Sequence, residues 1–240
     1  TTAVRVLEAL SPSVSYDFMT QNLGFTTLVN SDLNSAALGL GGLTYGVNTV
    51  EMAAAYSAFA NNGVYTRPRT YIEVRDNKGN LVLENKQESW VAMKESTAYS
   101  INELLKGVVR SGTGTEAAFS GMTIAGKTGT SNDAFDVWFV GYAGDQCAAV
   151  WMGFDQPRSL GRRAQGAGLA LPVWIDYMRD AIKNEPNVVR KAPPGVTEEG
   201  GNLYYTNRKD AIPNLGLDQP ATDDPIGALI HDSSVRGQIF

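Results

Sequence analysis

Ile124-Ala125-Gly126-Lys127-Thr128-Gly129-Thr130-Ser131 is the stretch from which the fold of this chain can be worked out. Two apolar runs follow it along the chain, and only the short turn 143–146 separates them. Short apolar runs that meet at a tight turn predict neighbouring buried strands. We therefore expect three adjacent antiparallel strands, at 122–131, 136–143 and 147–154.

The centre of this stretch also carries chemistry. Lys127, Thr128, Gly129 and Thr130 combine a cation, two hydroxyls and a residue without a side chain, which lets another backbone come close. A strand with an unpaired edge can bind an extended peptide, and a lysine beside it attracts a carboxylate or assists a neighbouring hydroxyl. Four residues alone leave a second interpretation open, a strand-terminal turn that happens to hold Lys and Gly.

Side-chain direction raises a difficulty for the binding interpretation. In a regular strand Lys127 and Thr128 point to opposite faces. Both reach one cleft only if Thr128 looks over the strand edge. Asn132, Asp133 and Asp136 follow the stretch, and we expect them to turn and anchor the strand rather than to line a cleft.

The rest of the chain predicts helices around this sheet. Apolar spacing and capping signals indicate helices near 4–10, 12–22, 49–62, 95–110 and 172–183, and a hairpin at 71–84 with one wet face. The last helix carries an apolar stripe suited to covering the sheet. The fold class expected is therefore α+β, an antiparallel sheet flanked by helices. The glycine- and threonine-rich loop 111–120 either borders a cleft or is a plain connector.

The surroundings of the stretch resemble one protein family. The matching runs are Gly112-Thr113-Gly114-Thr115, 127–133, 136–142 and 149–155. Together they resemble the transpeptidase domain of a penicillin-binding protein, most of all the bifunctional class A type, a superfamily that uses S-x-x-K, S-D-N and K-T-G motifs. The resemblance covers residues 1 to about 182. We therefore divide the chain into 1–184, the C-terminal part of that domain, and 185–240, a Pro-rich extended appendage with a short strand near 203–205.

One motif of that family is missing. No serine here is followed three residues later by lysine, and the single S-x-N match is Ser100-Ile101-Asn102. That match lies on a helix whose apolar positions are expected to share one face: Ile101, Leu104, Leu105, Val108 and Val109. Residues two apart on a helix do not converge, so we interpret Ser100 and Asn102 as a decoy.

The resemblance also implies where the nucleophile lies. In the family a helix start like Thr1-Thr2-Ala3-Val4-Arg5 comes shortly after the S-x-N motif, and here it opens the chain. The chain is thus expected to begin just after the second motif. The transpeptidase fold would be incomplete, because its N-terminal part and the nucleophile are not in this chain.

What the resemblance implies is acyl transfer at D-Ala-D-Ala. Lys127 would steer the terminal carboxylate of the substrate and hold the S-x-N serine, while the hydroxyls of Thr128 and Thr130 would bind that carboxylate. Gly129 would leave the strand bare for the substrate backbone, and the Thr130 N–H would be an oxyanion-hole donor. The implied partners are peptidoglycan stem peptides, β-lactam antibiotics and the missing N-terminal half, possibly as a second chain. No cofactor is implied.

Two other functions remain open. A serine β-lactamase shares the Lys-Thr-Gly feature but deacylates with water. A β-lactam sensor or a partner-binding module would have lost catalysis. Inspection of the upstream segment for Ser-x-x-Lys would separate these classes.

Composition excludes further classes. The net charge is −5 without a long basic run, which argues against a nucleic-acid partner. One cysteine, Cys147, and one histidine, His231, allow neither an internal disulfide nor a Cys/His zinc site, and we predict no metal. Cys147 is expected to be a buried small hydrophobe. No apolar run approaches the roughly 20 residues of a membrane span. The implied location, the extracytoplasmic face of the bacterial membrane, would need an upstream anchor.

Overall fold

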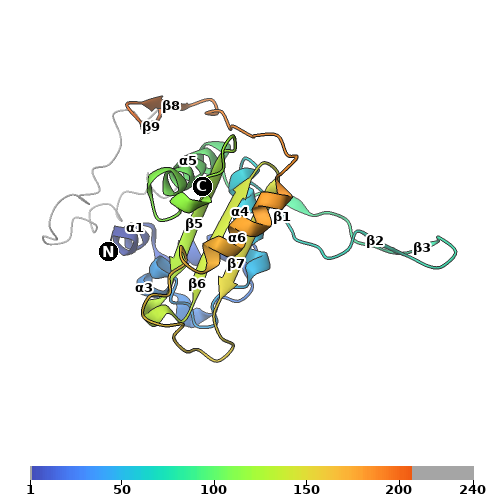
Figure 1. Cartoon of the computed structure of the whole chain (residues 1–240), viewed down its shortest axis with the longest axis horizontal. Helices are drawn as coiled ribbons and strands as arrows, with labels where there is room; N and C mark the ends of the chain where they lie inside the picture. Colours follow the sequence, from blue (N-terminus) through green and yellow to red (C-terminus); the bar gives the residue numbers. More distant parts are fainter. Residues whose placement is uncertain (1, 207–240) are drawn as a thin grey trace, which may run out of the picture. The chain divides into compact units, whose positions relative to one another are not determined.

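The computed structural model describes residues 2–206, which fall into two compact units (Figure 1). Among the described residues, one unit comprises 2–48 with 190–206, and the other comprises Thr49–Val189. The expected division of the chain at 184/185 remains a prediction. His231 and most of the expected appendage lie outside the described residues.

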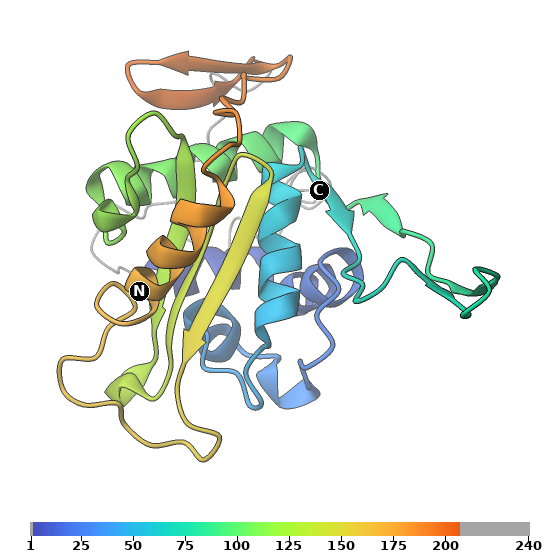
Figure 2. The same cartoon turned by 45° about the vertical axis from the view of Figure 1, so that its right-hand side comes forward.

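The 49–189 unit is built on a three-stranded antiparallel sheet in the order β5-β6-β7 (Figures 1 and 2). The strands are β5 (Ile124–Thr130), β6 (Val137–Ala143) and β7 (Gln146–Met152). The three predicted strands are thus confirmed, with ends that differ by one or two residues. Their apolar runs and the two-residue turn between β6 and β7 were enough to locate them.

Helices cover both faces of this sheet, which confirms the α+β class (Figure 2). On one face lies α6 (Ala170–Ala181), whose Trp174 ring packs edge-on to Phe139 of β6 at a centroid distance of 4.9 Å. Tyr142 leaves β6 on the opposite face, where α4 (Thr49–Ala60) and α5 (Glu95–Ser111) pack. The rings of Phe139 and Tyr142, which lie on opposite faces of β6, are almost fully buried, so the sheet is the centre of the hydrophobic core.

The buried stripe of α5 differs from the predicted one. Leu104, predicted to face the core, is 67% exposed. The buried positions are Ala98, Tyr99, Asn102, Leu105 and Val109. The helical period was right, but the stripe is centred on Asn102, whose Oδ1 accepts a hydrogen bond of 3.0 Å from the Tyr142 hydroxyl. A polar residue with a buried partner is invisible to a hydrophobic pattern.

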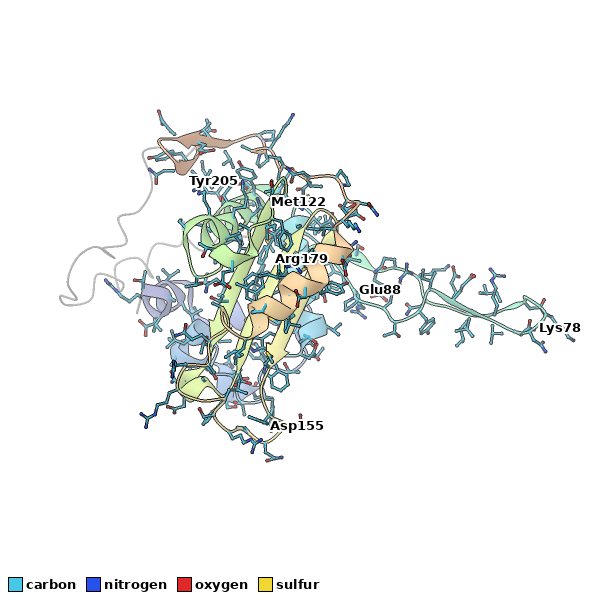
Figure 3. All side chains as sticks on the ribbon, viewed as in Figure 1. Lys78, Glu88, Met122, Asp155, Arg179 and Tyr205 are labelled. Carbon is cyan, nitrogen blue, oxygen red and sulfur yellow. The ribbon has the colours of Figure 1, made fainter. Side chains whose placement is uncertain are left out.

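The predicted hairpin forms a ribbon that extends away from the rest of its unit (Figure 3). Strands β1 (Val64–Thr66) and β4 (Ser89–Val91) pair at its base, near Glu88, and β2 (Glu73–Arg75) and β3 (Leu81–Glu84) lead to Lys78 near its tip. All residues of β2 and β3 are exposed, so the expectation that only one face of the hairpin is solvent-exposed is wrong. The alternation of apolar and charged residues predicted that one face of the hairpin would be buried. No described element packs on either face of the ribbon.

The other unit contains short helices and one hairpin. Its elements are α1 (Thr2–Leu10), α2 (Pro12–Asp17), a π-helical turn (Phe18–Asn22), a 3₁₀ turn (Asn30–Asp32), α3 (Ser35–Leu40), β8 (Val196–Glu199) and β9 (Asn202–Tyr205). The helix predicted from Pro12 ends at Asn22 as expected, although its last part is π-helical. The strand predicted near 203–205 is confirmed as β9, and its partner β8 was not predicted.

Candidate active site on strand β5

Strand β5 presents one edge to the outside of the sheet. It pairs with β6 on one side, and among the described strands none pairs with its other side. The Ser131 N–H donates to Asp136 O at 2.9 Å on the β6 side. In an antiparallel strand the backbone N–H and C=O groups of successive residues point alternately to the two sides. Those of Ser131 point toward β6, so the N–H and C=O groups of Thr128 and Thr130 point away from it. The edge therefore has the geometry that pairs with an extended peptide.

Lys127 and Thr128 leave β5 on opposite faces. The register pairs Lys127 with Val140 and Thr128 with Phe139, so Thr128 lies on the α6 face and Lys127 on the α4/α5 face. The lysine side chain nevertheless curls over the edge, where Nζ donates to Thr128 O at 2.8 Å and lies 3.5 Å from Thr128 Oγ1. The difficulty seen in the sequence is thus resolved by the lysine, not by the threonine. Partial burial lowers the pKa of Lys127.

The hydroxyls of Thr128 and Thr130 are each held from a different loop. Thr128 Oγ1 lies 2.6 Å from Thr113 Oγ1, in the loop that follows α5. Thr130 Oγ1 accepts a hydrogen bond of 3.1 Å from the Gly166 N–H, in the loop that precedes α6. The 111–120 loop therefore contacts this strand, and its expected place at the border of a cleft remains a prediction.

Beside β5, the backbone packs closely at a glycine that the sequence did not single out. A Cβ on Gly129 would lie 3.2 Å from Trp138 Cβ, a close but tolerable contact. A Cβ on Gly166 would lie 2.4 Å from Trp138 O and 2.7 Å from Gly129 O, which no side chain can occupy. Gly166 is thus the residue whose missing side chain lets a loop rest on β5. The only signal for it was its place in a Gly-rich loop.

The residues after β5 anchor the strand, as predicted. Asp136 accepts hydrogen bonds from Trp151 Nε1 at 2.9 Å and from the Ser131 hydroxyl at 3.2 Å. Asp133 takes a positive φ of 56° in the 3₁₀ turn Asn132–Ala134. This network closes the β5–β6 connection and holds the end of the candidate site in place.

Ser100 and Asn102 are not positioned as a catalytic pair. The Ser100 hydroxyl donates to Ser96 O at 2.9 Å within its own helix. Asn102 is 2% exposed and accepts from Tyr142 in the core. The Ser100 side chain therefore bonds within α5 and the Asn102 side chain bonds to β6, in line with the interpretation of this S-x-N match as a decoy.

The environment of the cysteine thiol in the 2–206 range indicates a structural role. Burial raises the pKa of the Cys147 thiol to about 12, and its Sγ donates to Ala53 O at 3.3 Å. That environment fits an unreactive thiol.

Within residues 2–206 there is no group of three or more His, Cys, Asp or Glu that could hold a metal. None of the helices there is long and apolar enough to cross a membrane.

Comparison with known proteins identifies relatives that match most of the chain. Residues 10–173 match the family described as "Penicillin binding protein transpeptidase domain". The chain is 36% identical to penicillin-binding protein 1A of Neisseria meningitidis over 222 residues, which is 90% of this chain and 27% of that protein. The chain therefore spans about a quarter of the length of such relatives.

Solved structures share the fold. Penicillin-binding protein 1A from Haemophilus influenzae aligns with a TM-score of 0.73 at 22% identity, over 85% of this chain and 38% of that one. The PonA1 protein from Mycobacterium tuberculosis in complex with penicillin V aligns with a TM-score of 0.62 at 21% identity, over 78% of this chain and 54% of that one.

Proposed function

The chain belongs to the penicillin-binding protein transpeptidase family, and from this premise we propose that the protein containing it cross-links peptidoglycan by serine D,D-transpeptidation. One observation carries the proposal. The exposed edge of β5 brings together the ammonium of Lys127 and the carbonyl and hydroxyl of Thr128. An edge with a cation and hydroxyls suits an extended peptide that ends in a carboxylate.

Each residue has a proposed role. The Lys127 ammonium and the Thr128 and Thr130 hydroxyls bind the terminal carboxylate of a D-Ala-D-Ala stem peptide, or the carboxylate of a β-lactam. The Thr130 N–H points away from β6 and donates to the oxyanion of the tetrahedral intermediate. Gly129 leaves the α4/α5 face of the strand without a side chain next to Lys127.

The proposed reaction has two acyl transfers. A serine hydroxyl attacks the carbonyl carbon between the two D-alanines, and its proton goes to the departing D-alanine amine as the C–N bond breaks. The amine of a second stem peptide then attacks the acyl-enzyme ester. The new amide forms, and the serine regains a proton from that amine. Lys127 serves this chemistry by electrostatics and carries no covalent intermediate.

The nucleophile is proposed to lie outside these 240 residues, because the chain has no Ser-x-x-Lys and its S-x-N match is built into α5. A segment carrying both motifs, in the same polypeptide or as a second chain, would complete the cleft beside β5. We also propose that the intact protein acts at the extracytoplasmic face of the bacterial membrane, where its substrate is, and that an upstream segment anchors it.

The test is a two-substrate assay on the intact protein. It is incubated with a stem pentapeptide as donor and a second stem peptide with a free amine as acceptor, and the products are identified by mass spectrometry. The proposal predicts a cross-linked dimer that has lost one D-alanine, and inhibition of its formation by benzylpenicillin. Hydrolysis of benzylpenicillin without cross-linking would instead indicate a β-lactamase. A protein that binds penicillin but releases no product would indicate a sensor.

A further inference from the structure

Thr113 contacts the candidate site although it lies far from β5 in the sequence. It is the second residue of the run Gly112-Thr113-Gly114-Thr115, just beyond the end of α5. Its Oγ1 lies 2.6 Å from Thr128 Oγ1, a short hydrogen bond between hydroxyls. Thr113 is otherwise exposed, so this contact is not a by-product of core packing.

The loop that carries Thr113 is held rigidly on both sides of that residue. The N–H groups of Gly112 and Gly114 both donate to Val108 O, at 3.0 and 3.1 Å. A Cβ on Gly112 would lie 2.8 Å from Val108 Cα, so only glycine fits there. Gly114 is buried, and a Cβ there would come within 3.3 Å of Phe139 Cε2. The two glycines thus press the loop onto α5 and β6, which places Thr113 at one position beside β5.

The direction of the hydrogen bonds determines which protons are available to a ligand. The Gly166 N–H is a donor only, so Thr130 Oγ1 accepts from it and keeps its own proton for another acceptor. Thr128 Oγ1 likewise keeps its own proton for another acceptor when it accepts a hydrogen bond from the Thr113 hydroxyl. Thr128 and Thr130 are two residues apart on one face of β5, so both hydroxyls lie on the same side of the strand.

We propose that Thr113 is a positioning residue for substrate recognition: its hydroxyl donates to Thr128 Oγ1 and thereby turns the Thr128 proton toward a carboxylate at the β5 edge. The inference rests on the proposed function, in which that carboxylate belongs to the stem peptide or to a β-lactam. Thr113 does not touch the reacting carbonyl. Without it, the Thr128 hydroxyl loses its 2.6 Å contact and keeps the longer, 3.5 Å contact from Lys127 Nζ, so the ligand must do more to orient it, which weakens binding of the carboxylate.

The experiment measures carboxylate selectivity in the intact protein. The second-order rate constant for acylation is determined with benzylpenicillin and with benzylpenicillin methyl ester, which lacks the anionic carboxylate. Thr113→Val keeps the shape and removes the hydroxyl. It is expected to lower the benzylpenicillin constant by about threefold to tenfold, the effect of one hydrogen bond, and to leave the ester constant unchanged. Thr113→Ser, which retains the hydroxyl, is expected to restore the benzylpenicillin constant.

Two features keep the result unambiguous. The ratio of the two constants is measured on one preparation, so it does not depend on the fraction of folded protein. Thr115→Val makes the same change on an exposed side chain two residues along and is expected to keep the wild-type ratio. An equal ratio in wild type and Thr113→Val would overturn this inference and leave the proposed function standing. A wild-type protein that benzylpenicillin does not acylate would overturn the proposed function and this inference with it.

Discussion

The Nζ of Lys127 donates to the carbonyl oxygen of Thr128 at 2.8 Å, although the two side chains leave β5 on opposite faces. The lysine thus occupies the edge of its own strand, where an extended peptide would pair. Under the proposed function, a ligand that pairs with this edge is expected to take over the Thr128 carbonyl and to release the ammonium toward its own carboxylate. The contact gives the lysine a defined resting position close to the place where charge is needed.

Replacement of Lys127 by alanine is expected to slow acylation of the intact protein by benzylpenicillin. Loss of one charge-assisted contact in a preorganised site is worth about 3 kcal/mol, on the order of a hundredfold in rate. The fold should stand, because Lys127 is exposed and no core contact is lost. Labelled penicillin measures the rate, and Lys183→Ala, which removes an exposed lysine beyond the end of α6, is the control. An unchanged rate would mean that Lys127 takes no part in acylation.

Replacement of Gly166 by alanine is expected to destabilise the chain and to displace its loop from β5. The added Cβ would lie 2.4 Å from Trp138 O and 2.7 Å from Gly129 O, both backbone atoms that cannot yield. Overpacking of this kind typically costs about 1–3 kcal/mol. Urea unfolding measures the loss. Gly168→Ala is the matched control, because its nearest contact would be Gln165 O at 3.8 Å. Equal stability of the two variants would contradict the packing described here.

The 240-residue chain by itself is expected to form no covalent adduct with benzylpenicillin. Its S-x-N serine, Ser100, donates to Ser96 O within α5, and no lysine follows it by three positions to activate it. Mass spectrometry of the chain after exposure to the drug tests this. Addition of a second chain that carries Ser-x-x-Lys and Ser-x-Asn is expected to restore labelling, on the added chain. A stable adduct on any serine of the 240 residues would show that the nucleophile has been misplaced.

Stability is expected to fall as the pH rises above about 9. Burial raises the pKa of Cys147 from an ordinary value of 9.0 to about 12, and that of Tyr56 from 10.0 to about 12. Above pH 9 the unfolded chain releases the Cys147 proton while the folded chain keeps it, so alkaline pH favours unfolding. One such group contributes at most about 1.4 kcal/mol per pH unit.

The measurement is urea unfolding of the chain between pH 8 and pH 10. Cys147→Ala removes the thiol and is expected to flatten the decline between pH 9 and pH 10, whatever constant loss of stability the smaller side chain causes. The slope, rather than the stability itself, is therefore the quantity to compare. The same slope in both proteins would mean that Cys147 titrates normally in the folded state.

The sequence alone was sufficient to locate the three strands of the sheet. Strands β5, β6 and β7 are apolar runs joined by short connections, and both features act over a few residues. The same local reasoning located the hairpin and recognised Ser100-Ile101-Asn102 as part of a helix. The Lys127-Thr128-Gly129-Thr130 run could be recognised as a candidate binding site from the sequence because its chemical groups are adjacent in the chain.

Tertiary structure decided what depends on residues that are far apart in sequence. Thr113 reaches Thr128 across 15 positions and Gly166 reaches Thr130 across 36, because the loop that follows α5 and the loop that precedes α6 both come to β5. Burial of Asn102 instead of Leu104 likewise depends on Tyr142, 40 positions away. Periodicity reports which face of an element is apolar, but it carries no information about which distant side chain will meet that face. The positions of the hydroxyls at the candidate site are set by such long-range contacts.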